Sequence, residues 1–178
     1  MIDRIIRAIK LDKTLFAEAA KNESLLSESL IVVVLAAVLT GIGSMINADQ
    51  PILALISEIA NNVIFGWLLW SVIAYFVGTF FFGGKSTINE MLRTIGYANA
   101  PRLLSLFAFI PCVGWLFVLL GGVLSLIAGV IAIRESMEFN NDKALITAII
   151  GFILFLMSSA VLRVLFAGIS LPFQSLFN

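Results

Sequence analysis

Long apolar runs that contain no charged residue alternate with short charged segments along this chain of 178 residues. The charge-free runs cover residues 29–48, 59–84, 103–133 and 144–162, which gives lengths of 20, 26, 31 and 19 residues. An α-helix needs about 20 apolar residues to cross the hydrocarbon core of a bilayer. A soluble domain of this size would interrupt such runs with polar faces. The pattern therefore predicts an all-α fold, a polytopic transmembrane helical bundle.

Turn-forming residues set the ends of the predicted spans. A polar turn at 47–51 closes the first span, and Gly83 and Gly84 break the helix after the second. A helical turn from Ile52 can precede that second span. The full spans are predicted at 30–46, 59–82, 115–133 and 144–164.

The run of 31 residues after Arg102 is long for one span and short for two. Pro111 removes a helix hydrogen bond and Gly114 permits a tight turn, so we expect a hairpin there. Its first arm, which ends at Ile110, has about 14 residues and would reach about 21 Å as an α-helix. We therefore expect five spans, the third short or kinked at Pro101. A bundle of four spans is the alternative.

The N-terminal segment is amphipathic at the helical period. Residues 2–10 carry isoleucines at i, i+3, i+4 and i+7, and Arg4, Arg7 and Lys10 occupy the other face. Such a helix suits the surface of an anionic leaflet. Packing against the inner rim of the bundle is an equal alternative.

A second amphipathic helix is predicted at 87–97, on the cytoplasmic face. Thr87 and Glu90 have the spacing of a capping box, in which the threonine caps a free amide and the glutamate reaches back. An apolar stripe follows at positions 88, 91, 92 and 95. We expect both amphipathic helices to be interfacial.

Basic residues divide unequally between the two sides of the predicted bundle. With five spans, ten of the 11 lysines and arginines fall on the side of the N-terminus and only Arg163 falls on the other. The positive-inside rule then places the N-terminus in the cytoplasm and the C-terminus outside. A bundle of four spans would place nine basic residues on one side and two on the other, so charge barely distinguishes four spans from five. The predicted domains are a cytoplasmic amphipathic segment at 1–29, a five-helix membrane domain at 30–168 and an interfacial tail at 169–178.

Composition narrows the classes of function. The chain is 61% hydrophobic and 12% charged, against roughly 25% charged residues in soluble domains. Its net charge of zero gives no basic field for nucleic acid. Without histidine and with Cys112 as its one cysteine, it has neither an ordinary zinc-ligand set nor an internal disulfide. We therefore expect no catalytic residues, no metal, no cofactor and no enzymatic activity.

A short motif precedes the predicted third span. Gly96, Tyr97 and Pro101 follow the order Gly-Tyr-x-x-x-Pro. This motif resembles the signature of the Yip1 domain family and stands where that family has it. Further segments at 82–87, 111–115 and 133–136 are similar to prokaryotic members, so the resemblance covers almost the whole chain.

The resemblance implies five spans with a cytoplasmic N-terminus, in the cytoplasmic membrane of a prokaryote. Eukaryotic relatives act in vesicle traffic between the endoplasmic reticulum and the Golgi, with small GTPases of the Rab type as partners. They have a longer cytoplasmic N-terminal region and an Asp-Leu-Tyr-Gly-Pro motif. This chain has about 29 residues there and lacks that motif, which counts against GTPase binding.

Polar residues in or beside the spans are candidate functional residues, because they are costly in hydrocarbon. We expect Arg102 to pair with Glu135 or Glu138, or to bind lipid phosphate; snorkelling to the inner interface is the alternative. Arg163 is expected near the outer edge, where it snorkels or pairs with Glu58. The full set of candidates is Tyr97, Asn99, Pro101, Arg102, Asn61, Asn62 and Arg163.

The asparagines and Tyr97 have structural alternatives. Asn61 and Asn62 point about 100° apart on a helix, so one can bond across helices, or both can mark an interfacial helix start. Tyr97 and Asn99 can line a break near Pro101, where freed backbone groups need partners. Broken helices of this kind build substrate sites in transporters, and they also occur for packing alone.

Small residues make one face of the predicted span at 115–133 suited to close helix contact. Gly121, Ser125 and Gly129 lie four apart, the spacing of a small-residue packing face. We expect this face to pack helices together or to join copies in a homo-oligomer.

Two hypotheses of function follow. The first is a non-enzymatic membrane component with a role in membrane organisation, trafficking or scaffolding, through contacts with membrane lipids or a protein partner. The alternative is an oligomeric permease or channel for a small solute, an ion or a lipid. A continuous polar cavity lined by Asn61, Asn99 or Arg102 would favour transport, and tightly packed spans with lipid-filled grooves would favour the scaffold.

Overall fold

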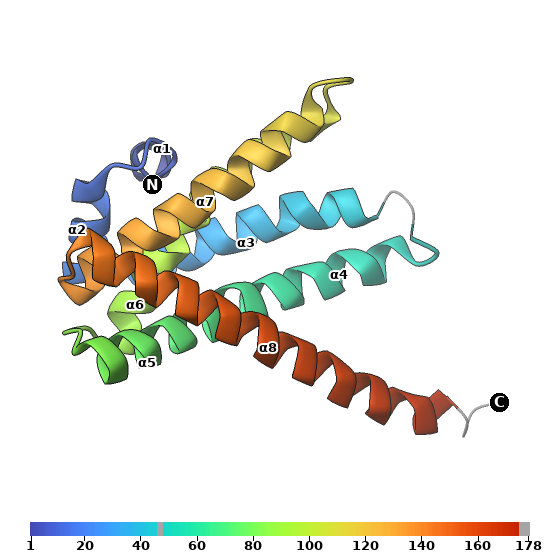
Figure 1. The fold of residues 1–178 in the computed structure, drawn as a ribbon. Helices are drawn as coiled ribbons and strands as arrows, with labels where there is room; N and C mark the ends of the chain where they lie inside the picture. The colour runs from blue at the N-terminus through green and yellow to red at the C-terminus, as the bar shows by residue number, and fades with distance from the viewer. Residues whose placement is uncertain (46–47, 175–178) are drawn as a thin grey trace.

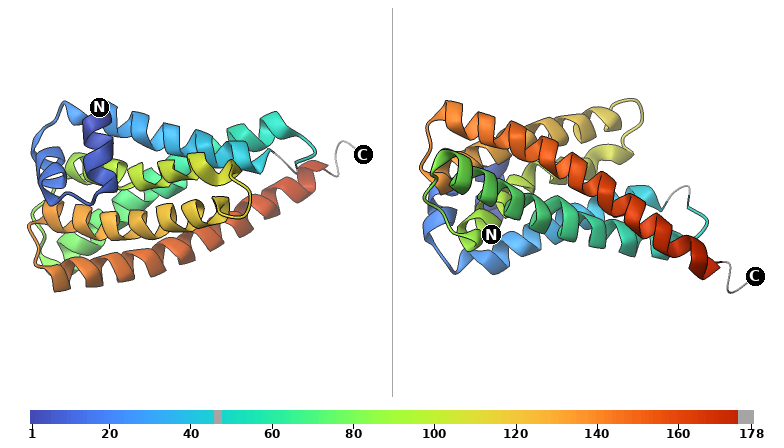
Figure 2. Two further views of the ribbon diagram at one scale, coloured as in Figure 1. Left: turned by 90° about the horizontal axis from the view of Figure 1, so that it is seen from above. Right: turned by 60° about the horizontal axis from the view of Figure 1, so that its bottom comes forward.

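The computed structural model describes the backbone of residues 1–45 and 48–174 and the side chains of residues 1–45 and 48–158. Every element in the described residues is helical, and the long helices run between two ends of an elongated bundle (Figure 1, Figure 2). The elements are α1 (Ile2–Ile9), α2 (Lys13–Lys21), α3 (Leu25–Ser44), α4 (Pro51–Asn61), η1 (Asn62–Leu69), α5 (Trp70–Phe82), α6 (Ile88–Ala98), η2 (Ala100–Phe109), α7 (Gly114–Met137) and α8 (Asn141–Gln174).

Four helices of the described chain are long and apolar enough to cross a membrane: Leu25–Ser44, Pro51–Phe82, Gly114–Met137 and Asn141–Ser158. The all-α membrane bundle predicted from the charge-free runs is thereby confirmed. The predicted count of five spans is not met by these criteria, because the third predicted span is not a helix of this length. Its place is taken by α6 followed by η2.

The segment η2 is a 3-10 helix of 10 residues. Together α6 and η2 lead the chain from the end where α5 finishes to a hairpin tip at 110–113, after which α7 returns alongside η2 (Figure 1). A 3-10 helix rises about 2.0 Å per residue, so 10 residues reach about 20 Å, where an α-helix would reach about 15 Å. The hairpin predicted from Pro111 and Gly114 is present, and the extended geometry lets its short first arm reach the tip.

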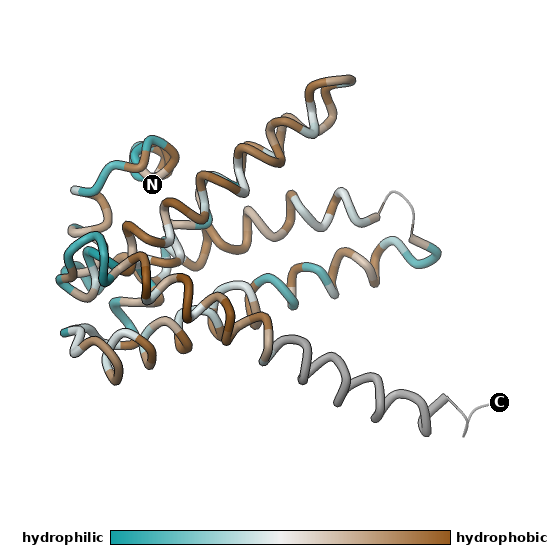
Figure 3. Tube along the Cα trace, viewed as in Figure 1, coloured by the Kyte–Doolittle hydropathy of each residue, from teal (hydrophilic) through white to brown (hydrophobic). Residues whose placement is uncertain are grey.

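The second long helix changes winding in its middle. It is α-helical in α4, π-helical over the 8 residues of η1 and α-helical again in α5. It ends at Gly83, whose φ of 67° is in the left-handed region that glycine adopts without a steric penalty. Figure 3 shows a hydrophilic stretch in this helix far from its ends, where α4 meets η1.

Helix α6 has the predicted capping box between Thr87 and Glu90. It is not an interfacial helix, however, and that prediction is wrong. Every residue from Arg93 to Ala98 is buried, and the helix packs against α2, α3, α5 and α7. The reason is that the polar side chains of its later turns find partners inside the protein. The Arg93 Nε and Nη2 donate to the carbonyl oxygens of Ala19 and Ala20 at 2.8 and 2.6 Å.

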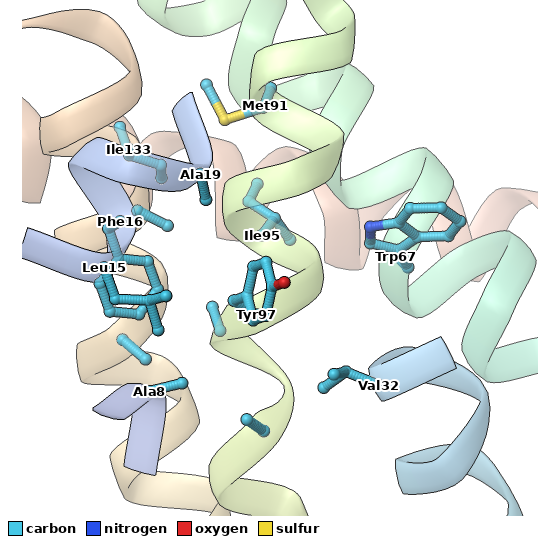
Figure 4. Close-up of a cluster of buried hydrophobic side chains, with 14 of the residues drawn as sticks. Ala8, Leu15, Phe16, Ala19, Val32, Trp67, Met91, Ile95, Tyr97 and Ile133 are labelled. Atoms are coloured by element: carbon cyan, nitrogen blue, oxygen red, sulfur yellow. The ribbon is translucent and has the colours of Figure 1, made fainter. Parts of the chain in front are cut away.

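The core is concentrated around α6. Figure 4 shows Tyr97 and Ile95 of α6 between Leu15 of α2 and Val32 of α3, with Ile133 of α7 on the same side as α2. These side chains are at most 2% exposed. We call this region the packed end: α2, α6 and the adjoining ends of α3 and α7.

Helix α1 packs on the rim of the packed end. Its Ala8 is fully buried, and Ile5 and Ile9 contact the core. The two arginines of its basic face pair with carboxylates of α2, of the N-cap of α2 and of α3, which favours the rim over a lipid surface. Arg4 pairs with Glu18 and Glu28 at 3.0 Å each, and Arg7 pairs with Asp12 and Glu18 at 2.9 Å each.

The last helix, α8, runs to Gln174, beyond the predicted end of the last span near Val164. The predicted interfacial tail at 169–178 therefore begins inside this helix. Residues 175–178 lie outside the described residues, as do 46–47 in the turn after α3.

Candidate functional site

A cavity of about 920 Å³ lies between α4, η1, the start of α5, α6, η2, α7 and α8. Its walls are mainly apolar and include Phe65, Leu126 and Phe152. It is open to the outside along α7 and α8, since the lining residues Leu126 and Ile153 are 61% and 52% exposed. Its polar lining residues are Glu58, Asn61, Asn62, Asn99, Arg102 and Ser125.

Four of these side chains form one hydrogen-bonded set, which we call the polar cluster: Glu58, Asn62, Asn99 and Arg102. The Arg102 Nη1 donates to the Oδ1 atoms of Asn62 and Asn99, at 3.0 and 3.3 Å. The Asn62 Nδ2 donates to a Glu58 carboxylate oxygen at 2.7 Å. The Asn62 amide thus stands between a cation and an anion and bonds to both.

Irregular backbone on both sides positions the polar cluster. Asn62 is the first residue of the π-helical η1, and π segments are frequent at functional sites. On the other side, Pro101 lies in the first turn of η2 and has no N–H to donate. The Asn99 Nδ2 caps the end of α6 by donating to the Ile95 carbonyl oxygen at 2.9 Å. This leaves the Asn99 Oδ1 free to accept from Arg102.

Arg102 keeps unused donors toward the cavity. Its guanidinium has five N–H groups, yet in the described part of the chain only Nη1 has hydrogen-bond partners. The Glu58 carboxylate similarly accepts through Oε1 alone among the described contacts. A cation and an anion with spare bonding capacity therefore face one cavity.

The structure brings together four of the candidate residues: Asn61, Asn62, Asn99 and Arg102 line the cavity. Tyr97 does not line it; the side chain is fully buried in the packed end (Figure 4). The side chain of Arg163 lies outside the described residues, and with it the predicted pair between Arg163 and Glu58.

The predicted pairing of Arg102 with Glu135 or Glu138 is wrong. Arg102 bonds to Asn62 and Asn99, and Glu135 accepts hydrogen bonds from Arg134. The reason is distance along α7. The backbone beside Arg102 packs against Gly121, and at 1.5 Å per residue Glu135 lies about 20 Å further along the helix.

Glu58 and the π-helical turn were missed by sequence reasoning as parts of this site. Glu58 interrupts the apolar pattern of α4 four residues before Asn62, so the two side chains lie on one face of a helix. That spacing was the available signal. No residue pattern marks η1 as π-helical.

The small-residue face of α7 is used inside the chain. A Cβ on Gly121 would lie 2.8 Å from the Pro101 carbonyl oxygen, so this glycine permits close contact between α7 and η2. Ser125 and Gly129 line the cavity instead. Gly121 thus lies where α7 and η2 approach closely, and contact between copies at this face stays a prediction.

Comparison with known families identifies the chain. The family model of the Yip1 domain matches residues 13–162. The chain belongs to the Yip1 domain family. No curated protein and no solved structure matches it.

The Yip1 motif of this protein joins the packed end to the cavity. A Cβ on Gly96 would lie 2.7 Å from the Cβ of Ser29, so this glycine lets α6 approach α3 closely. Tyr97 fills the core, and Pro101 starts η2 against α7. The motif therefore fixes where α6 ends and where Arg102 enters the cavity.

Proposed function

We propose that this Yip1-family membrane protein is a non-enzymatic component that contributes to membrane organisation by binding phospholipid in its cavity. The observation that carries the proposal is the open cavity of about 920 Å³, whose apolar walls meet a single polar cluster with unused arginine donors. A phospholipid has the same division, with apolar chains and a phosphate. The family membership and the apolar helices support the membrane setting.

Arg102 is the residue best suited to hold the phosphate. Arginine in an apolar environment is costly unless it is paired, and guanidinium binds phosphate through parallel, charge-assisted hydrogen bonds. The lipid chains would lie along Phe152 and Ile153 of α8, in the open side of the cavity. In this arrangement the headgroup enters the cavity and the chains stay largely in the surrounding bilayer.

Native mass spectrometry of the purified protein tests this proposal. The protein is extracted in mild detergent, and retained phospholipid is counted for the wild type, Arg102→Gln and Arg134→Gln. Arg134 is the matched control, because it pairs with Glu135 away from the cavity. We expect Arg102→Gln to lower lipid retention about tenfold, the worth of one or two charge-assisted hydrogen bonds, and Arg134→Gln to retain it. Equal retention by all three proteins would contradict the proposal.

A second candidate function is the passage of lipid or a small solute across the membrane. The observation in its favour is the position of the polar cluster. Arg102 follows the 11 residues of α6 and precedes most of η2, so about 15 to 20 Å of helix lies on either side of it. A headgroup site near the middle of the bilayer is what movement between leaflets requires.

Liposome assays separate the two candidates. Transport predicts that the reconstituted protein exposes fluorescent inner-leaflet phospholipid to an external quencher, or releases trapped solute, faster than empty liposomes do. A binding role predicts retained lipid without lipid movement between leaflets and without solute release. Arg102→Gln should abolish any flux that depends on the cavity, and Arg134→Gln should not.

We also propose an N-terminus in the cytoplasm and a C-terminus outside, in the cytoplasmic membrane of a prokaryote. Support comes from the basic residues, ten of which fall on one side when α6 and η2 count as a crossing. A topology reporter fused after Asn178 should be active only outside the cytoplasm. Activity only in the cytoplasm would contradict this orientation.

A further inference from the structure

We propose that the cavity recognises a zwitterionic phospholipid with a primary ammonium group, of the phosphatidylethanolamine type, whose phosphate binds Arg102 and whose ammonium binds Glu58. This inference rests on the proposed lipid-binding function and adds the identity of the headgroup. The contact between Glu58 and the ammonium would make the site prefer this headgroup over anionic headgroups.

The first support is that the two charges are held apart. Arg102 and Glu58 both line the cavity, and each bonds to Asn62 and not to the other. The distances are 3.0 Å on the arginine side and 2.7 Å on the glutamate side. An amide that bonds to both prevents the ion pair from collapsing, so a positive and a negative end remain available to a ligand.

The second support is the spacing of those ends. The separation between the guanidinium and the carboxylate is spanned by one amide group and its two hydrogen bonds. An ethanolamine headgroup carries its phosphate and ammonium on either side of two carbons. With a hydrogen bond at each end, such a headgroup can run alongside Asn62 from Arg102 to Glu58.

The third support is the chemistry of the unused groups. The Nε and Nη2 of Arg102 can donate to two phosphate oxygens, which is the bidentate geometry that arginine favours. The free Oε2 of Glu58 can accept an N–H from a primary ammonium. A quaternary ammonium has no N–H and offers only charge. A headgroup without an amine would leave the Glu58 carboxylate unpaired in an apolar cavity, which is costly.

The apolar walls select a lipid over a free headgroup. Phe65, Leu126 and Phe152 line the same cavity as the polar cluster, and their apolar side chains match acyl chains. A soluble zwitterion would leave that surface exposed to water and gain nothing from it.

The test is a competition with the wild-type protein in detergent micelles, so it needs no variant that might misfold. Lipids with identical acyl chains and phosphoethanolamine, phosphocholine or phosphoglycerol headgroups compete for the site, and glycerophosphoethanolamine provides the same headgroup without chains. We expect the ethanolamine lipid to bind about tenfold more tightly than the other two, from one added charge-assisted hydrogen bond. Glycerophosphoethanolamine should not displace it at the same concentration.

Three results would overturn the inference: equal binding of the choline lipid, equal or tighter binding of the glycerol lipid, or displacement by glycerophosphoethanolamine. The first two would leave the proposed lipid-binding function intact, with recognition through Arg102 alone. The absence of any bound lipid would overturn both proposals.

Glu58→Gln locates the source of the selectivity. It keeps a partner for Asn62 and removes the charge that would attract the ammonium. We expect this variant to bind the ethanolamine and glycerol lipids equally, while Glu135→Gln, the matched charge removal outside the cavity, keeps the tenfold preference. Unchanged preference in Glu58→Gln would overturn the assignment of the ammonium to Glu58.

Discussion

Two arginines on neighbouring helices have very different surroundings: Arg93 is buried, and Arg102 is partly exposed beside the cavity. Arg93, at the packed end, is 4% exposed and gives Nε and Nη2 to carbonyl oxygens of α2. Arg102, one helix further along, gives only Nη1 to two amide oxygens and faces the cavity. The first arginine closes the end of a helix, and the second leaves donors unused.

The comparison separates a structural polar group from a candidate site. Around Arg93 the helices pack densely, and Trp67 likewise donates to a carbonyl oxygen, that of Leu92, at 2.8 Å. Around Arg102 no residue of α4 is buried, and α7 and α8 are spaced widely enough to leave the cavity. Burial of a charge alone therefore does not indicate function; unused bonding capacity toward an open cavity does.

The largest expected effect is on the packed end. Arg93→Met should lower the free energy of unfolding by about 3 kcal/mol, because two buried carbonyl oxygens lose their donors. Arg102→Met should cost less than about 1 kcal/mol, since its amide partners face the open cavity. Thermal or denaturant unfolding in micelles measures both. Equal losses in the two variants would remove the distinction between structural and functional arginine.

Close helix contact in the Yip1 motif gives the next effect. Gly96→Ala places a Cβ against Ser29 and should destabilise the protein by about 2 kcal/mol through overpacking. The control is Gly43→Ala, because nothing lies within 4 Å of a Cβ at that helical glycine. It should be neutral or slightly stabilising, as expected for alanine in a helix. Equal free energies of unfolding for the two variants would show that the motif glycine does not act through contact with α3.

Filling the cavity should affect binding and spare the fold. Gly122 lines the cavity, and a Cβ at this position would have open space within 4 Å. We expect Gly122→Leu to lower phospholipid retention about fivefold by occupying space that the lipid needs, with unfolding unchanged within about 1 kcal/mol. Gly43→Leu, outside the cavity, should leave retention unchanged. Native mass spectrometry with an unfolding curve tests this prediction, and wild-type retention in Gly122→Leu would contradict it.

The smallest effect concerns pH at the N-terminal rim. A hydrogen bond from Arg7 and two from Thr14 lower the pKa of the Asp12 carboxyl to about 2, below its usual 3.8. Arg7 and Arg4 also lower the pKa of Glu18. Acids whose pKa is lowered by folding stabilise the folded state above their unfolded pKa and lose that contribution as pH falls through the folded value.

The free energy that holds α1 against the packed end should therefore be constant above about pH 5 and fall between about pH 4 and pH 2. Hydrogen exchange of the α1 amides, corrected for intrinsic rates, measures this loss of protection. Asp12→Asn should reduce the pH dependence. Protection of α1 that does not change between pH 5 and pH 2 would show that these ion pairs contribute nothing to docking.

The sequence allowed most of the membrane architecture to be predicted, because hydropathy and helix-breaking residues act locally. The charge-free runs gave the long helices, and Pro111 with Gly114 gave the hairpin. The prediction that α6 is interfacial was wrong because the partners of Arg93 lie in α2, more than 70 positions away in the chain. No local pattern reveals such a contact.

The candidate site was predictable only in part. Because polar side chains are costly in hydrocarbon, Asn62, Asn99 and Arg102 were predicted as candidates, and all three line the cavity. Their mutual contacts depend on the π-helical turn at Asn62 and on the 3-10 geometry of η2, which shift side chains relative to an α-helix. The expected carboxylate partners of Arg102 are therefore replaced by two amides, and one of these, Asn62, lies 40 positions away in the chain.

The most direct test of the central claim, that the cavity holds a phospholipid, is quenching of Trp70 by lipid with brominated acyl chains. Trp70 lines the cavity, whereas Trp67 is 5% exposed in the core and Trp115 is 67% exposed at the hairpin tip. Trp115→Phe removes the exposed reporter, and a second protein that also carries Trp70→Phe gives the contribution of Trp67.

We predict that brominated ethanolamine lipid quenches Trp70 saturably at a low mole fraction, that Arg102→Gln abolishes this quenching, and that Arg134→Gln preserves it. Quenching of Trp70 that rises only in proportion to the brominated fraction, and is the same in Arg102→Gln, would contradict the claim. Such a result would show that Trp70 meets only the bulk lipid around the protein.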